Sequence, residues 1–429
     1  MVHFPLIALI VVAGLALVHA FLMGVHTWEH RRFVRRRLAE LDRFHPTGQA
    51  MVFVPCKGVD IGLEANLRRF FQQDYDDYEI TFVVESPWDP ACDVISRVMA
   101  RYPDRVSHLV VAGRAVDCGQ KVHNLHTAVR RILSSRIELL AFADSDARPR
   151  REWLRVLLGR LNENGSGKVG AVTGYRWMTP IRPSLANHLL YSINCGVATL
   201  LGSRRRYPIW GGSWAIRRDT FEAVGMIDAW RGTLSDDLVA TRVLRRHHLD
   251  VCFEPACMVA SPTDGTLGDH LEFLRRQYVI SRCYLPSLWW CGLAWSSLHA
   301  AGWVAMGTLL VWAVAAGSSW TPAAAVACLT LYGLGVIRAA MRQKLLDLYV
   351  PGGSRRMAGA SRFDIWGGFL AGLINAATIV GSSVGCRIRW RNIAYRLKPG
   401  GQTEILDHRW PLAEPAASER NEDEQKKVA

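Results

Sequence analysis

The chain has 429 residues, half of them hydrophobic, and a formal net charge of +14. Its ten cysteines form no CxxC pair and no Cys/His cluster with zinc spacing, which argues against a structural metal and indicates reduced thiols in a cytosolic domain. The arginines crowd beside apolar runs, where attraction to anionic lipid headgroups explains the charge with fewer assumptions than nucleic acid does, so no nucleic-acid partner is expected.

The N-terminus predicts a membrane anchor, which we assign to residues 1–30. Phe4–Met23 is an apolar run of roughly the 20 residues that cross a bilayer. Five arginines follow it closely: Arg31, Arg32, Arg35, Arg36 and Arg37. The positive-inside rule then places the chain after residue 30 in the cytosol. A cleaved signal peptide is the alternative, but its basic residues should precede the apolar stretch, and no small-residue cleavage site precedes the arginines.

Residues 31–284 predict an α/β domain. Short β-branched or apolar runs alternate with helical stretches, as expected of a sheet covered on both faces. The predicted strands are Met51–Pro55, Ile80–Glu85, Ser107–Ala112, Leu139–Ala143 and Val169–Tyr175. Such sheets bind ligands beyond the carboxyl ends of their strands, so polar residues just after a strand are the candidates for a site.

A first acidic station follows the second predicted strand in the segment VVESPWDPACDV. Glu85 and Asp89 could hydrogen-bond the ribose or base of a nucleotide, although the two prolines of this segment also suit a plain loop. Lys57 after the first strand, and Lys121 with Asn124, could contact phosphate. Taken alone, each lysine fits a solvated surface position better than a phosphate contact.

A second acidic station is Asp144-Ser145-Asp146, at the end of the apolar run LLAFA. Two carboxylates one residue apart can hold a hard divalent cation that bridges a diphosphate, so Asp144 and Asp146 are the candidate ligands of Mg²⁺ or Mn²⁺. Acidic pairs after strands also cap helices, and that alternative applies here.

A third acidic station, Ser235-Asp236-Asp237, precedes the helical run LVATRVLRRHH and follows a glycine-rich segment that contains Gly212. A carboxylate at a helix start could accept the proton of an attacking hydroxyl, while glycine lets the backbone approach a sugar. Helix capping needs only one of the two acids, which leaves the other available for function.

After Tyr284 the chain becomes apolar again. The candidate membrane segments, within residues 285–386, are Leu288–Gly317, Pro322–Ile337 and Ile365–Val384. Basic residues flank the last one on both sides, so charge does not orient it and an interfacial helix is the alternative. Residues 387–429 are a basic segment followed, beyond Ala413, by a tail whose composition predicts disorder.

Taken together, this order of motifs resembles the glycosyltransferase A-type fold of family-2 enzymes and, more closely, the ceramide glucosyltransferase family. The segments that carry the resemblance span nearly the whole chain. They are PCKGVD at Pro55–Asp60, NLRRFFQQDYDDYEI at Asn66–Ile80, DPACDV at Asp89–Val94, KVHNL at Lys121–Leu125, DSDAR at Asp144–Arg148, GGSWAIRRD at Gly211–Asp219, SDDL at Ser235–Leu238 and WRNIAYRLKPGG at Trp390–Gly401.

The resemblance implies a role for each aspartate station. Asp89 is the first aspartate, near the nucleotide; Asp144, helped by Asp146, is the metal-linked second; Asp237, beside Asp236, is the catalytic third. It implies an inverting transfer of a hexose, glucose by resemblance, from a UDP-sugar onto the hydroxyl of a membrane lipid such as ceramide. The metal and nearby cations would stabilise the departing diphosphate.

The chain departs from the family pattern at one motif. The family has Q/R-x-x-R-W before its membrane segments, whereas Arg276-Gln277-Tyr278-Val279-Ile280 keeps the first arginine and lacks the final Arg-Trp. Arg275, Arg276 or Arg282 could compensate, because guanidinium pairs well with phosphate. A basic collar at the membrane surface is the alternative reading of Arg282.

Two other functions are alternatives to this one. A processive polysaccharide synthase shares the aspartate stations but relies on an intact QxxRW and on more membrane helices. A non-catalytic membrane protein that binds nucleotide or lipid is the second alternative, and retention of all three stations argues against it. We therefore expect an integral membrane protein with a cytosolic catalytic domain that meets its lipid acceptor in the bilayer.

Overall fold

The computed structural model describes residues 3–132, 136–162, 168–204 and 207–408. Its centre is a seven-stranded sheet in the order β3-β2-β1-β4-β7-β5-β8. The strands are β1 (Ala50–Pro55), β2 (Tyr78–Val84), β3 (Ser107–Val111), β4 (Leu139–Ala143), β5 (Val169–Thr173), β7 (Ser213–Arg217) and β8 (Asp250–Phe253). Most neighbours are parallel, but β7 runs antiparallel to both β4 and β5. The predicted α/β class is confirmed.

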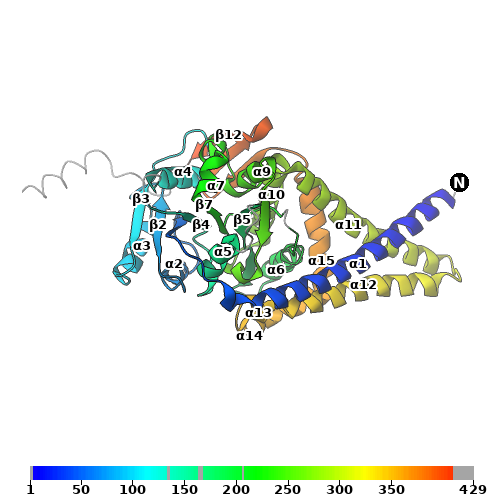
Figure 1. Ribbon diagram of the computed structural model, residues 1–429. Helices are drawn as coiled ribbons and strands as arrows, with labels where there is room; N and C mark the ends of the chain where they lie inside the picture. Colours follow the sequence, from blue (N-terminus) through cyan, green and yellow to red (C-terminus); the bar gives the residue numbers. More distant parts are fainter. Residues whose placement is uncertain (1–2, 133–135, 163–167, 205–206, 409–429) are drawn as a thin grey trace, which may run out of the picture.

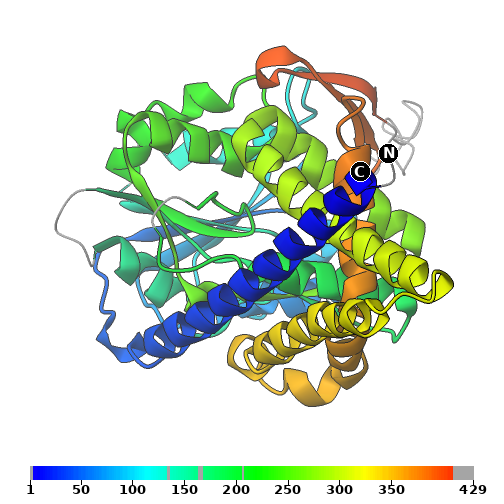
Figure 2. The ribbon, with the colours of Figure 1, turned by 90° about the vertical axis from the view of Figure 1, so that its right-hand side faces the viewer.

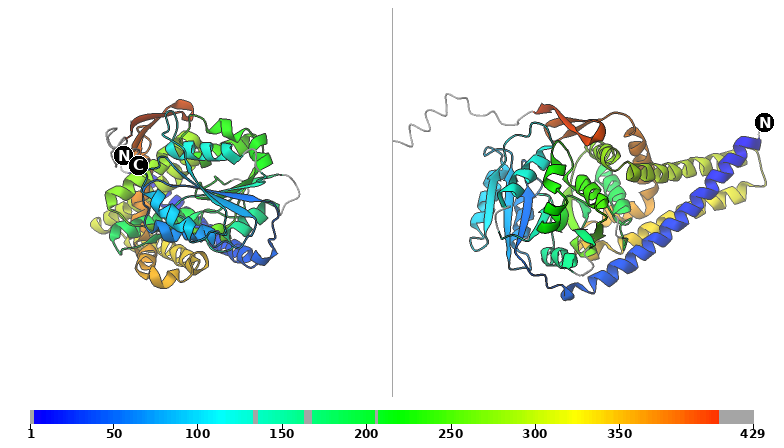
Figure 3. Two further views of the ribbon diagram at one scale, coloured as in Figure 1. Left: turned by 90° about the vertical axis from the view of Figure 1, so that its left-hand side faces the viewer. Right: turned by 45° about the horizontal axis from the view of Figure 1, so that its top comes forward.

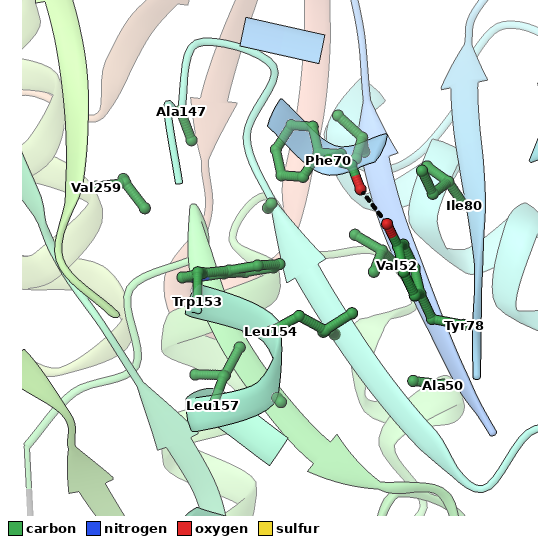
Figure 4. Packing of buried hydrophobic residues seen from close by; sticks show 14 of the residues in the cluster. Ala50, Val52, Phe70, Tyr78, Ile80, Ala147, Trp153, Leu154, Leu157 and Val259 are labelled. Carbon is green, nitrogen blue, oxygen red and sulfur yellow. Dashed lines mark hydrogen bonds between the residues drawn. The ribbon is translucent and has the colours of Figure 1, made fainter. Parts of the chain in front are cut away.

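Helices cover both faces of this sheet (Figure 3). They are α2 (Leu63–Phe71), α3 (Ala91–Ala100), α4 (Gln120–Ile132), α5 (Trp153–Asn162), α7 (Arg218–Ala223), α8 (Met226–Trp230) and α9 (Asp236–Arg246). Because successive strand residues point to opposite faces, Val52 packs into one core cluster and Phe53 into the other. Figure 4 shows the first cluster, where Tyr78 of β2 donates its hydroxyl to the Phe70 carbonyl of α2 at 2.8 Å.

Strand β7 is fixed to the sheet by aromatic packing. Trp214 lies directly opposite Phe142 of β4, with ring centroids 4.3 Å apart. Such a pair contributes about 0.5–1.5 kcal/mol beyond the area it buries. The same register sets Ser213 opposite Ala143, so that the glycine-rich segment before β7 meets the residues that follow β4.

A second layer joins the sheet to the apolar helices. Strands β6 (Arg176–Pro180) and β9 (Val259–Thr263) form a parallel pair. Helix α6 (Leu185–Ala198) begins at Ser184, whose hydroxyl accepts from the Asn187 amide. Helix α10 (Leu267–Tyr284) begins with a reciprocal capping box between Thr266 and Asp269.

Four helices in the described residues are long and apolar enough to cross a membrane, and they project to one side of the α/β domain (Figures 1 and 2). They are α1 (His3–Leu38), α11 (Pro286–Ala315), α12 (Thr321–Gln343) and α15 (Ala358–Gly381). Each contains or overlaps one predicted segment. Gly302 of α11 lies against Ala16 of α1, the small-residue contact expected between membrane helices.

The end of the described chain forms structure that the sequence did not predict. Short helices α13 (Leu346–Tyr349) and α14 (Gly353–Arg356) precede α15, and an antiparallel sheet follows it. This sheet comprises β10 (Arg387–Trp390), β11 (Ile393–Leu397) and β12 (Thr403–His408). It packs on the α/β domain, where Tyr395 accepts from the Gln120 amide at 3.2 Å. The tail predicted to be disordered lies outside the described residues.

Candidate active site

The turn after β4 carries the second acidic station. All five residues of β4 are buried, and the chain emerges from the sheet at Asp144. Burial and the neighbouring Asp144 raise the pKa of Asp146, which accepts from the Ser261 hydroxyl of β9 at 2.8 Å. A Cβ on Gly212 would lie 2.7 Å from Asp144 Oδ2, so glycine is needed for the glycine-rich segment to approach this carboxylate so closely.

The third acidic station begins α9. Ser235 is the N-cap and accepts from the Leu238 amide at 3.2 Å, so neither Asp236 nor Asp237 is the capping residue itself. Asp237 Oδ2 accepts from the Gly211 amide at 2.8 Å, while Oδ1 accepts from Ser235 and Leu238. These contacts hold the half-buried Asp237 carboxylate in one orientation beside the glycine-rich segment.

Asp236 has a different environment from Asp237. It is buried, and its Oδ2 accepts no hydrogen bond from any residue that the structure describes. Burial raises the pKa of Asp236 to about 7; Lys121 opposes this rise, and the negative charges of Asp237 and Asp144 add to it. Asp236 is therefore a buried carboxyl group that titrates close to neutral pH.

Lys121 of α4 joins the two stations. Its Nζ lies 2.7 Å from Asp144 Oδ1, 3.3 Å from Asp236 Oδ1 and 3.3 Å from the Gly211 carbonyl. Burial alone would lower the pKa of Lys121, but the carboxylates of Asp144, Asp236 and Asp237 raise it above its ordinary value. From the sequence we expected Lys121 to contact phosphate; in this structure it is a half-buried counter-ion between carboxylates.

The first acidic station lies at the ends of β1 and β2. Asp89 Oδ1 accepts from the Gly58 amide at 2.8 Å and from the Ala91 amide at 2.9 Å, so it joins the loop after β1 to the first residue of α3. Lys57 pairs with Glu85, whose pKa is raised by burial despite this contact. The station is linked to the β4 turn through Asp60, which accepts from the Ser145 hydroxyl at 2.6 Å.

The remaining predicted residues lie on helices. Asn124 accepts from Gln120 at 2.8 Å, one turn beyond Lys121, and thereby steadies the start of α4. Gln277 is half-buried on α10. Arg282 donates to the carbonyls of Ser382 and Gly385, after α15, and so ties α10 to the end of that membrane helix. Among the three arginines that could compensate for the altered motif, Arg276 is the one whose charge interacts with Arg176 of β6.

Several residues of the site were not selected from the sequence. Ser261 contacts Asp146, Asp60 contacts Ser145, and Arg176 lies close enough to Asp146 to favour its ionised form. Asp60 belongs to the segment PCKGVD, which offered a signal, but Arg176 and Ser261 lie on the β6–β9 pair, which the sequence did not predict.

The carboxylates fit a divalent cation that is shared with a substrate. Among the described residues no three His, Cys, Asp or Glu side chains form a metal cluster. Asp144 and Asp146 nevertheless offer carboxylate oxygens and are both half-buried, and Mg²⁺ is commonly held by one or two carboxylates together with substrate phosphates. The donor set therefore suits a metal that arrives with a diphosphate rather than a resident structural ion.

Replacing Lys121 by Met is expected to destabilise the protein by about 3–5 kcal/mol, because it leaves buried carboxylates without their counter-ion. Asp236 has a raised pKa in the folded state, so its contribution to stability is present at low pH and is lost as the pH rises through about 7. Without Lys121 that pKa rises further. The thermal unfolding midpoint in detergent should therefore fall more steeply between pH 6 and pH 8 in the variant.

Lys398→Ala is the control for the Lys121 substitution, since it removes a lysine from a surface ion pair with Glu404. Its midpoint should stay close to that of the wild type at both pH values. If Lys121→Met behaved in the same way, the lysine would not be the counter-ion of the carboxylates.

The chain is similar to one described protein family and to curated relatives. A family model described as Glycosyl transferase family 21 matches residues 11–403. Ceramide glucosyltransferase 1 of Caenorhabditis elegans is 30% identical over 147 residues, 33% of this chain and 29% of that protein. Ceramide glucosyltransferase 3 of the same organism is 32% identical over 82 residues, 19% of this chain and 18% of that protein. Each match thus spans less than a third of the relative's length.

One solved structure is similar over most of its length. It is titled "Mannosyltransferase PcManGT from Pyrobaculum calidifontis in complex with GDP-Man and Mn2+". Its sequence is 16% identical and its TM-score is 0.45, with 86% of this chain and 97% of that chain covered.

Proposed function

This chain belongs to glycosyl transferase family 21 and is a glycosyltransferase, and we propose that it moves a hexose from a UDP-sugar onto the hydroxyl of a membrane lipid such as ceramide. The observation that carries the proposal is the meeting of Asp144, Asp236 and Asp237 around Lys121, in a domain joined to four apolar helices. Glucose is the sugar that the ceramide glucosyltransferase relatives suggest.

In the proposed donor site, the nucleotide lies toward β1 and β2 and the diphosphate toward the β4 turn. Glu85 is a buried carboxylate that pairs with Lys57. Asp89 accepts from the Gly58 amide and so holds the loop that carries Lys57. Asp60 connects this region to Ser145, so nucleotide and diphosphate would contact one continuous surface. Asp144 and Asp146 would hold Mg²⁺ or Mn²⁺, which when bound offsets the negative charge of the diphosphate.

Asp237 is the proposed general base. Its carboxylate is half-buried and oriented by Gly211 and Ser235, whereas the Asp236 oxygen without a partner is closed off from solvent. The lipid hydroxyl would give its proton to Asp237 as its oxygen attacks the anomeric carbon. The bond from that carbon to the diphosphate oxygen breaks on the opposite side, so the transfer inverts configuration. Asp236 and Lys121 would keep the charge of the pocket balanced.

The acceptor would reach this pocket from the bilayer. Helix α10 packs against α11 and α15, and its Tyr278 hydroxyl is bonded to Asn375 of α15. The site therefore adjoins the apolar helices, as a lipid acceptor requires. We place the α/β domain in the cytosol, because basic residues end α1 at Arg35, Arg36 and Arg37.

Lipid-dependent release of UDP tests the proposal. Purified protein with Mg²⁺ or Mn²⁺ is incubated with UDP-glucose, UDP-galactose, UDP-N-acetylglucosamine or UDP-glucuronic acid, with and without ceramide. We expect UDP release that requires both metal and ceramide, and a product carrying one hexose. Transfer of the sugar onto a growing polysaccharide, with release of free UDP, would support a processive synthase instead. Metal-dependent UDP binding without transfer to ceramide, diacylglycerol or any lipid of a native extract would support the non-catalytic alternative.

A further inference from the structure

Two arginines near the carboxylates lack full compensation of their charge. Arg176 of β6 and Arg276 of α10 both lie over the ring of Phe273, at 4.9 and 5.3 Å from its centroid. The Nε of each is buried and makes no hydrogen bond within the described part of the chain. Burial, followed by repulsion from Arg176, lowers the pKa of Arg276 to about 10, even though Glu272 on the same helix opposes this shift.

Without an anion nearby, two such arginines destabilise the folded protein. Two guanidinium groups that repel one another, each with an unused buried donor, are stabilised when a group with several acceptor oxygens enters between them. Arg176 also interacts with the charge of Asp146, so this pair borders the β4 turn rather than the outer surface of the domain.

A third arginine comes from the C-terminal sheet. Arg391, in the turn between β10 and β11, has φ of 54°, a conformation that disfavours residues other than glycine. Its guanidinium pairs with Asp60, whose other carboxylate oxygen accepts from Ser145. Arg391 also contributes to the repulsion on Arg276. Strained backbone of this kind is retained where the side chain has to be placed for a purpose.

Trp390 fixes this turn to α10. The Arg276 guanidinium lies 5.4 Å from the centre of the Trp390 ring, and its Nη1 donates to the Arg389 carbonyl at 3.2 Å. Arg276 is thus held between Phe273 and Trp390, a stacked arrangement that pre-organises its fork of donors.

We propose that Arg176, Arg276 and Arg391 form one anion pocket that takes the diphosphate of the sugar nucleotide, with Trp390 as the positioning residue for Arg276. The inference rests on the proposed function and deepens it, because Arg176 and the Trp390-Arg391 corner lie outside the aspartate stations. The pocket borders the DSD turn through Arg176 and Asp146 on one side and through Arg391, Asp60 and Ser145 on the other. A diphosphate bound there would contact the three arginines and would also reach the candidate metal ligands.

The C-terminal sheet then has a functional role. Its hairpin brings an indole and a guanidinium beside Arg276 of α10. Two hydrogen bonds hold the C-terminal sheet against the α/β domain: the Gln120 amide donates to Tyr395, and the Thr403 amide donates to the Gly232 carbonyl.

The pocket is tested by comparing UDP with uridine, which lacks the diphosphate. Dissociation constants are measured by titration calorimetry on the full chain in detergent with Mg²⁺, for wild type, Arg391→Gly, Arg176→Met and Arg176→Lys. Arg391→Gly removes the guanidinium while placing at φ of 54° the residue that suits it, so the fold should be preserved. Arg389→Ala is the matched control, since it removes an exposed arginine from the same hairpin and leaves its carbonyl in place.

We expect Arg391→Gly and Arg176→Met each to weaken UDP binding by roughly 10- to 100-fold, the usual consequence of losing a charge-assisted hydrogen bond. Arg176→Lys should lose less, and uridine binding should be unchanged throughout. If Arg391→Gly and Arg176→Met bound UDP as tightly as the wild type, the proposed pocket would be wrong. That conclusion would hold even if the protein still turned over UDP-sugar. Lost binding to phosphatidylserine vesicles with unchanged UDP affinity would overturn it in favour of a lipid headgroup. If the wild-type protein bound no UDP at all, the proposed function itself would fail.

Discussion

Asp237→Asn is expected to lower kcat for hexose transfer by about 100- to 10,000-fold, the usual contribution of a positioned general base. Asparagine keeps the size of the side chain and can still accept from the Gly211 amide, so the glycine-rich segment should stay in place. The dissociation constant for UDP should therefore change little. Single-turnover rates with UDP-glucose and ceramide, together with UDP titrations, separate the two effects.

The control for this variant is Asp228→Asn. Asp228 lies on α8, is exposed and pairs only at the surface with Arg231, so its replacement should leave kcat and UDP affinity at wild-type values. A variant at Asp237 that retained more than half of the wild-type kcat would show that another group accepts the proton. Asp236, with its pKa near neutrality, would then be the next residue to replace.

The sequence predicted the parallel half of the sheet because its strands have a local signal. Strands β1, β2, β3, β4 and β5 are short, largely apolar runs, and all five predicted ranges overlap the observed ones. Asp144 could be selected from the rule that ligand-binding residues gather beyond strand ends, whereas Asp237 begins α9 and was selected as a carboxylate at a helix start. The membership in the ceramide glucosyltransferase family predicted by resemblance is confirmed by the family model and the curated relatives.

The elements that were missed depend on partners far away in the sequence. Strand β7 has the sequence SWAIR, and only its antiparallel pairing with β4 brings Gly212, the residue before it, against Asp144. Strands β6 and β9 pair with each other across a separation that includes α6, β7 and α9. Local propensity does not predict pairing between strands so far apart in the sequence. The sequence therefore gave no signal for Arg176 and Ser261, which these strands place at the site.

The surroundings of charged residues were also not predictable from the sequence. Nothing in KVHNL reveals that Lys121 lies between two acidic stations rather than in solvent, because these neighbours come together only in the assembled fold. The sequence predicts only a basic segment directly after α15, with no strand in it, yet Trp390 and Arg391 lie against α10 and the loop after β1. In both cases the residue type indicated a possible role, but the residues around it could not be predicted.

Asp144→Ala is the second substitution with a large expected effect, on metal-dependent binding of the nucleotide. In the wild-type protein, removal of divalent metal with EDTA should weaken UDP binding, because Asp144 and Asp146 would share the ion with the diphosphate. Loss of residues that merely support a metal ligand costs 10- to 100-fold in affinity, so loss of a ligand should cost at least about 10-fold. UDP affinity of the variant should be low and the same with and without metal.

Asp144 also pairs with Lys121, so the variant has to be compared with one that changes this pair from the other side. Lys121→Met removes the ammonium but leaves both carboxylates of the DSD turn, and its UDP binding should still respond to metal. A metal response lost in Asp144→Ala and kept in Lys121→Met would assign the effect to the ion. Equal UDP affinity with and without metal in the wild-type protein would reject the DSD turn as a metal site, and Asp144 would then serve only as the partner of Lys121.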